Sequence, residues 1–209
     1  MKKLLFTIAA LSGLTVAAQA QHARFGVKAG GMLTTASRNN PGLTNLKNTF
    51  TPGAYAGGLV EFSFKSKADK FKLQLEADYS YMTVKHRYTV INQNVDDMSR
   101  AHMLSIPVLA KYFFTPSFSL YAGPSANLKL SSSAKTVGLN GGEFTTNTKD
   151  DVNMFQFGAM VGANYYIYKG FFVEARYHAI IPDYYKTGAP SRPEYGTIHN
   201  FQVGLGYKF

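Results

Sequence analysis

Eight segments in which apolar and polar residues alternate are the feature that most constrains how this chain folds. In the stretch FKLQLEADYSYMTV, at 71–84, every second residue up to Tyr81 is apolar, and the residues between them are charged or polar. A period of two places these sets on opposite faces of a β-strand, and helical spacing explains none of the segments well. The pattern therefore predicts strands at 24–33, 54–64, 71–84, 102–114, 118–130, 152–167, 171–180 and 200–209.

The connections between these segments alternate in length. Three are short, with the sequences KSKADK, TPS and YKG, and the four others are long, at 34–51, 85–101, 131–151 and 181–197. Long connections without regular structure are unusual in an ordinary soluble sandwich. Short turns at one end and long loops at the other are typical of outer-membrane barrels.

The short turns also predict the register of three hairpins. If the YKG turn is centred on Lys169, Glu174 lies opposite Asn164. If the TPS turn is centred on Pro116, Lys111 lies opposite Tyr121. Residues from polar faces also meet around KSKADK. Because a slip of one residue would turn every side chain to the other face, this agreement supports the strand interpretation.

Alternation alone leaves open which face of the barrel is apolar. A soluble barrel such as a lipocalin turns its apolar face into the lumen, whereas a membrane barrel turns it towards lipid. Strands of about 10 to 14 residues suit a bilayer crossing, and tyrosines lie near the ends of the apolar faces, as an interfacial girdle requires. We therefore predict an all-β, closed, eight-stranded antiparallel up-and-down transmembrane barrel with its apolar face outward.

Closure and two prolines give further expectations. In lipid the last strand must pair with the first, because an open edge would leave backbone groups without partners. The final stretch NFQVGLGYKF, at 200–209, alternates to its last residue, as such a strand would.

Pro107 and Pro124 fall inside predicted strands, where proline cannot donate to the ladder. We expect a bulge or a locally missing bond at each, and the alternative is that these strands break there.

The N-terminus has the three parts of a secretory signal peptide. Lys2 and Lys3 precede a short apolar stretch, and the sequence AQA before Gln21 fits a cleavage site. We therefore expect a cleaved signal peptide at 1–20 and a barrel domain at 21–209. The chain contains no cysteine, so no disulfide closes the fold.

The chain carries a formal charge of +10, which by itself would suit nucleic acid. An exported protein without a run of basic residues rarely meets nucleic acid, so we expect no such partner. Phosphorylated lipid of the outer membrane, or solvent around the loops, suits the excess charge better.

Six stretches spread over nearly the whole exported chain share motifs with one family. They are LQLEADYSYM, LSIPVLAKYFF, LYAGPSANLKL, FGAMVGANYYI, FFVEARYHAII and the terminal GLGYKF. In this order they resemble the outer-membrane β-barrel family described as "porin family" or PorT-like. The resemblance implies a small barrel in the cell outer membrane of a Gram-negative bacterium. It also implies a C-terminal signal for the barrel-assembly machinery, carried by Phe201, Val203, Leu205, Tyr207 and Phe209.

The polar faces predict the contents of the lumen. Eight strands enclose a space that side chains can just fill, and charges in that space must be paired. We predict a lumen charge cluster in which three glutamates balance three cations, namely Lys28, Glu61, Glu76, Lys111, Glu174 and Arg176. A plugged lumen cannot conduct solutes, so we expect the protein to have a structural or interaction role.

Two other functions stay open. The same cluster could line a narrow pathway for ions or a small solute, which would make the protein a passive porin. The long loops mix aromatic and polar side chains and suit a bound protein partner, as in an adhesin or a component of a secretion assembly.

No motif predicts catalysis, a cofactor or a metal. Glu174 and His178 share a strand face but lie too far apart along the strand for a dyad, and there is no G-x-S-x-G pattern. Adjacent aspartates in the long connections are too few ligands for calcium. We therefore expect a protein that is not an enzyme and has no cofactor.

Overall fold

The computed structural model describes residues 22–38, 44–64, 70–90, 93–137, 143–147, 154–181 and 195–209. The predicted signal peptide and most of the connection at 181–197 lie outside these residues. The elements are β1 His22–Arg38, β2 Thr44–Thr49, β3 Thr51–Ser63, β4 Phe71–Val90, β5 Gln93–Phe113, β6 Phe118–Val137, β7 Glu143–Asn147, β8 Phe155–Tyr168, β9 Phe171–Ile180 and β10 Tyr195–Lys208. No helix in the described part of the chain is long and apolar enough to cross a membrane.

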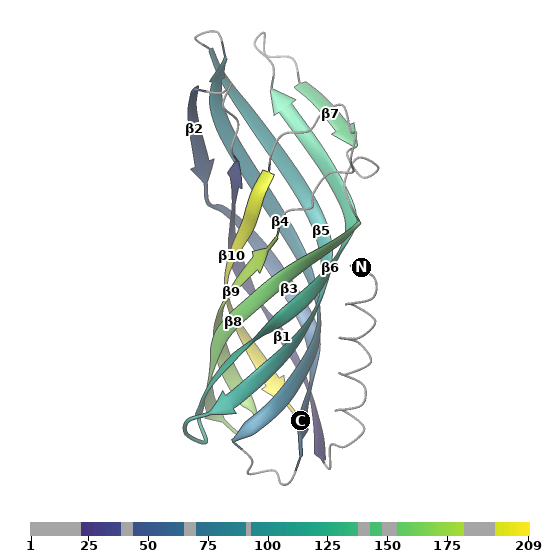
Figure 1. Ribbon diagram of the computed structural model, residues 1–209, viewed down its shortest axis with the longest axis vertical. Helices are drawn as coiled ribbons and strands as arrows, with labels where there is room; N and C mark the ends of the chain where they lie inside the picture. Colours follow the sequence, from purple (N-terminus) through teal and green to yellow (C-terminus); the bar gives the residue numbers. More distant parts are fainter. Residues whose placement is uncertain are drawn as a thin grey trace.

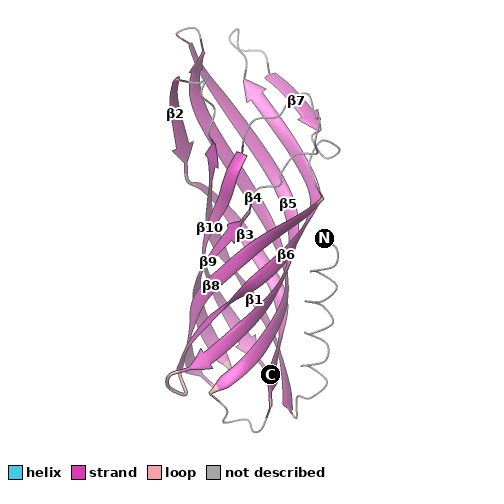
Figure 2. Ribbon diagram, viewed as in Figure 1, coloured by secondary structure: helices cyan, strands magenta, loops and turns pink. Residues whose placement is uncertain are grey.

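Eight of the strands close into an antiparallel barrel whose strands are tilted to its long axis (Figures 1 and 2). Around the wall the order is β4, β3, β1, β10, β9, β8, β6 and β5, and β5 pairs again with β4. The first strand pairs with the last, with Gly26 opposite Lys208 and Leu33 opposite Phe201. The predicted closed barrel of eight strands is therefore confirmed.

The registers of the short hairpins follow the prediction. Asn164 lies opposite Glu174, Lys111 lies opposite Tyr121, and Glu61 lies opposite Gln74 in the third hairpin. The turn between β8 and β9 consists of Lys169 and Gly170, whose φ angles of 34° and 95° are both positive. This is the pattern of a type I′ turn, whose twist matches that of the strands that it joins.

Both prolines lie in continuous strands whose pairing is interrupted locally. The β4–β5 ladder lacks the pair at Pro107 and the β5–β6 ladder lacks the pair at Pro124, with the same register on either side. The expected missing bond is confirmed, and neither strand breaks. Beside this gap a Cβ on Gly123 would lie 1.9 Å from the carbonyl oxygen of Val108, so only glycine allows the close approach of β5.

The connections predicted as long loops are partly strand. β4 and β5 continue as a paired ladder until Val90 lies opposite Gln93. β6 extends to Val137 and pairs with β7, and β2 pairs with β4. The prediction of irregular connections was wrong for these parts, because backbone pairing propagates along a hairpin without the apolar face that the sequence pattern detects. These extensions project from one end of the barrel (Figure 1).

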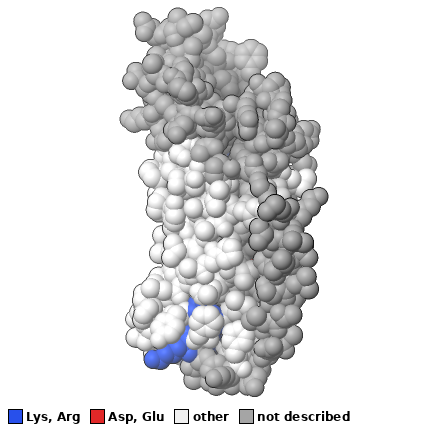
Figure 3. Space-filling model, in the orientation of Figure 1, with Lys and Arg blue, Asp and Glu red and all other residues white. Residues whose placement is uncertain are grey.

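The apolar faces turn outward and the polar faces turn into the lumen. Val203 and Leu205 are 67% and 65% exposed, whereas Glu76 and Lys111 are 3% and 0% exposed. On the face drawn in Figure 3, the described wall shows a broad band without charged side chains, and basic residues lie only near the end with the short turns. The predicted orientation of the two faces is confirmed.

Because Val203 is exposed on the outward apolar face of β10, Val203→Arg places a charge where the sequence predicts hydrocarbon. We expect the free energy of unfolding from lipid vesicles to fall by about 2–4 kcal/mol. The measurement is a urea titration followed by the heat-modifiable migration of the barrel on a gel. Val203→Leu, the control, should unfold as the unmodified protein does. Equal stability of the arginine variant would mean that this face meets water.

Candidate functional site

Charged side chains fill the barrel lumen. Lys28 on β1, Glu61 on β3, Glu76 on β4, Lys111 on β5, and Glu174 and Arg176 on β9 all point inward and are buried. They share the inner wall because residues two apart on a strand lie on one face. The six residues of the predicted cluster therefore lie in one enclosed space, where they belong to two connected groups.

The first, which we call the central group, consists of Lys28, Glu76, Asp78, Glu174 and Arg176. The Arg176 guanidinium donates from Nη1 to Glu76 Oε2 (2.8 Å) and from Nη2 to Asp78 Oδ2 (2.9 Å). Lys28 Nζ lies 2.6 Å from Glu76 Oε2 and 3.3 Å from Asp78 Oδ2. Glu174 Oε1 lies 3.6 Å from Lys28 Nζ. Two cations therefore hold three carboxylates together.

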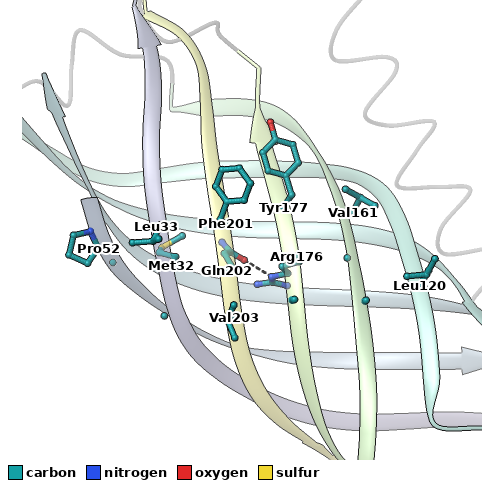
Figure 4. A pocket seen from close by; sticks show the side chains of 15 residues that line it. Met32, Leu33, Pro52, Leu120, Val161, Arg176, Tyr177, Phe201, Gln202 and Val203 are labelled. Atoms are coloured by element: carbon teal, nitrogen blue, oxygen red, sulfur yellow. Dashed lines mark hydrogen bonds between the residues drawn. The ribbon is translucent and has the colours of Figure 1, made fainter. Parts of the chain in front are cut away.

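Tyrosines and an amide complete the central group. The Tyr55 hydroxyl donates to Glu174 Oε1 (2.7 Å) and the Tyr121 hydroxyl donates to Oε2 of the same carboxylate (3.3 Å). The Arg176 guanidinium lies 4.5 Å from the centre of the Tyr55 ring, a cation–π distance. Arg176 Nε donates to the side-chain oxygen of Gln202 on β10, as Figure 4 shows. These contacts fix the guanidinium from several sides.

The second, which we call the mouth group, gathers lysines around one carboxylate near the short turns. Glu61 Oε2 lies 2.6 Å from Lys208 Nζ and 3.3 Å from Lys111 Nζ, and Oε1 lies 3.3 Å from Lys72 Nζ. Gln74 joins the two groups, because its oxygen accepts from Lys111 (3.0 Å) and its nitrogen donates to Glu76. The lumen network is thus continuous from the central group to the mouth.

Three charged members of the network were missing from the predicted cluster. Asp78, Lys72 and Lys208 lie on the polar faces of their strands, so alternation already placed them inward. Their partners could not be chosen from the sequence, because the axial level of each residue depends on how the strands are staggered around the barrel. Asp78 accounts for one of the two carboxylates that bind the Arg176 fork.

The contact between Arg176 and the two carboxylates crosses the full width of the barrel. Arg176 lies on β9, and Glu76 and Asp78 lie on β4. In the strand order of the wall, three strands separate β9 from β4 on one side and three on the other, so these two strands face each other. The central group therefore bridges opposite walls.

The lumen also contains a buried serine and histidine. Ser125 Oγ and His178 Nε2 are 2.8 Å apart, and Asn127 donates to the same serine oxygen. Both side chains are enclosed, which suits an internal hydrogen bond between β6 and β9. Among the described residues, no three His, Cys, Asp or Glu side chains form a group suited to a metal ion.

The outer wall has a shallow hollow of about 720 Å³. The hollow exists because small residues, among them Gly31, Ala163 and Ala175, form part of its floor, and Phe201 and Val203 border it. Figure 4 shows that Phe201 and Val203 belong to the same strand as Gln202, whose side chain meets Arg176. The hollow lies on the apolar band, and Arg176 and Gln202 of the central group also contribute to its lining.

Residues 17–179 match the model of the outer membrane protein beta-barrel domain. The chain belongs to this family. It is an outer-membrane β-barrel protein, and its place in the cell is the outer membrane. No curated protein matches the sequence significantly.

Solved structures show the same fold as this outer-membrane barrel. The crystal structure of Ail, the attachment invasion locus protein of Yersinia pestis, is 12% identical, with a TM-score of 0.53 over 90% of this chain and 100% of that chain. Ail in complex with the heparin analogue sucrose octasulfate is 10% identical, with a TM-score of 0.52 and the same coverage. Both likenesses support the barrel fold of this chain.

The C-terminal residues of this outer-membrane barrel form the outer face of β10. Phe201, Val203, Leu205 and Phe209 are exposed on the apolar side, and the Tyr207 ring lies 4.6 Å from the ring of Phe171. Their role as a signal for the assembly machinery stays a prediction.

Arg176→Met tests how strongly the central group depends on its guanidinium. The change leaves Glu76, Asp78 and Glu174 with Lys28 as the one remaining cation of that group, and we expect the free energy of unfolding to fall by about 3–5 kcal/mol. Urea unfolding in micelles measures the loss. Arg100→Met, at an exposed arginine of β5, is the matched control and should change little. An equally small loss at Arg176 would contradict the pairing.

Proposed function

We propose that this protein is a non-conducting, non-enzymatic barrel of the outer membrane, with a plugged lumen and a structural or interaction role. The observation that carries the proposal is the pair of contacts between Arg176 on β9 and the carboxylates of β4, which cross the lumen at 2.8 and 2.9 Å. Its partners are the outer-membrane lipid around the apolar band and the assembly machinery that inserts it.

The energetics of the central group favour a plug over a channel. A permeating ion would have to separate charges that are buried, paired and hydrogen-bonded on several sides. Separating one partner of such a pair costs about 3–5 kcal/mol, because the other charge is left uncompensated. Several contacts share the same cross-section, since Tyr55 and Tyr121 from β3 and β6 both bind Glu174 from β9.

Conductance in planar bilayers tests the plug. We expect no steady openings from the unmodified protein, and steady openings from the variant Tyr55→Ala, Glu174→Ala, Arg176→Ala, which removes three large side chains from the cross-section. Arg100→Ala is the control and should stay closed. Heat-modifiable migration on a gel shows whether each variant still forms a barrel. Steady openings of the unmodified protein would support the passive porin instead.

A second candidate function is partner binding at the end opposite the short turns. The observation that favours it is the strand extension, in which the β4–β5 ladder continues to Val90 and Gln93 and β2 adds to its edge. A paired extension offers a fixed backbone surface to a protein partner. In barrels of this class the longer connections face the cell exterior.

Replacing residues 86–97 with an Asn-Gly turn tests this candidate. We expect the barrel to assemble with unchanged heat-modifiable migration, because the wall below is intact. Cross-linking on intact cells, followed by mass spectrometry, should show an outer-surface protein joined to the unmodified chain and absent from the shortened one. Identical cross-linked products from both chains would contradict a role of this extension.

A further inference from the structure

We propose that the short-turn mouth of the lumen is a binding site for a phosphate-type oxyanion. A cavity of about 340 Å³ opens there, separate from the central group. Its walls combine cations, one carboxylate, three aromatic rings and two further residues of the β5–β6 turn, namely Arg24, Glu61, Lys70, Lys72, Phe113, Phe114, Thr115, Pro116, Tyr166 and Lys208.

The first argument is the charge balance of the mouth group. Among the described residues, Glu61 Oε2 is shared by Lys208 Nζ at 2.6 Å and Lys111 Nζ at 3.3 Å, and Lys72 Nζ lies 3.3 Å from Oε1 of the same carboxylate. The side chains of these lysines are 0 to 7% exposed, so water screens their mutual repulsion poorly. The single charge of Glu61 cannot neutralise both Lys111 and Lys208, which share one of its oxygens. An anion of charge −2 in the adjoining cavity would offset the excess.

The second argument is the position of the remaining cations. Arg24 and Lys70 also line the cavity, and Lys70 is exposed at its rim, whereas Lys208 is buried deeper. Arg24 Nε donates to the backbone oxygen of Phe209 (3.3 Å), which holds the guanidinium at the mouth. Cations therefore extend from the solvent edge to the buried end of the cavity. A cleft lined by one sign of charge attracts and concentrates the opposite ion.

The third argument concerns the shape of the ligand. Several oxygens on one centre can accept from Lys72, Lys208 and Arg24 together, which suits phosphate better than chloride. Phe113 and Tyr166 stack with ring centres 5.7 Å apart and form an apolar wall in the same cavity. The volume exceeds that of a bare phosphate, so a phosphate carrying an organic group fits. The site goes beyond the proposed plug and does not depend on it.

The mouth opens at the short turns, which face the periplasm in barrels of this class. Two sources of the same chemistry reach that place, a dissolved phosphate compound and the headgroup of a phospholipid in the inner leaflet. Both would present phosphate oxygens to the same cations. The experiment below separates them.

The test is a calorimetric titration with inorganic phosphate. The sample is the folded protein without its signal peptide, in neutral micelles, and chloride keeps the ionic strength constant. We expect saturable binding that Lys208→Gln weakens about tenfold, since it removes a charge-assisted contact. Lys169→Gln, at an exposed lysine of the β8–β9 turn outside the cavity, should bind phosphate as the unmodified protein does. Absence of saturable phosphate binding, or equal binding by Lys208→Gln, would overturn the site.

A second variant keeps the test decisive if Lys208→Gln fails to fold. Lys70 is exposed at the rim, so Lys70→Gln should leave the barrel intact and still weaken phosphate binding severalfold. Unchanged binding by this folded variant would then overturn the proposal.

Phosphate binding to the protein in nanodiscs of two lipid compositions identifies the source of the bound phosphate group. If a lipid headgroup occupies the mouth, inorganic phosphate should bind about tenfold more weakly in phosphatidylglycerol than in phosphatidylcholine, because anionic lipid competes. Equal affinity in both lipids would identify a dissolved phosphate compound as the ligand. Either result requires the saturable binding on which the proposal stands.

Discussion

Backbone hydrogen bonding in hydrocarbon is the constraint on which the rest of this structure depends. A membrane interior offers no water to a strand edge, so each strand needs a neighbour on both sides and the sheet must close. Here β10 meets β1 along a ladder from Gly26–Lys208 onward, and β5 returns to β4. Even Pro107 and Pro124 interrupt the pairing only locally, because the ladders on either side keep their register.

Closure with eight strands determines what the lumen can hold. The space is about as wide as the side chains that point into it, so the charges of the polar faces meet each other and leave water. Buried ion pairs are weak evidence for stability, since desolvation offsets much of their attraction. Here the ion pairs determine how the strands are placed. The contacts of Arg176 with its carboxylates, with Tyr55 and with Gln202 fix one arrangement of β9 against β4 and β10.

The two charged groups differ in balance and therefore in what they offer. The central group pairs two cations with three carboxylates and bridges opposite walls, and this contact is the proposed plug of the lumen. The mouth group surrounds one carboxylate with three lysines beside a cavity that opens at the short turns. The proposed plug and the proposed anion site therefore occupy different levels of the same barrel.

The sequence by itself determined the strands, the faces and the register of the short hairpins. A period of two is a local property, and a tight turn such as Lys169-Gly170 transmits it to the next strand. It also placed all six predicted cluster residues on inward positions, because Lys28 or Glu174 needs only its place in the alternation to be assigned to the lumen.

The tertiary structure decided which charges meet. Arg176 binds Asp78 across the barrel, and Glu61 binds Lys208, although 98 and 147 residues separate these pairs in the chain. Such contacts depend on the stagger and tilt of the whole wall, which no local pattern contains. The strand extensions beyond the barrel and the cavity at the mouth were decided in the same way, because both arise from the placement of neighbouring strands.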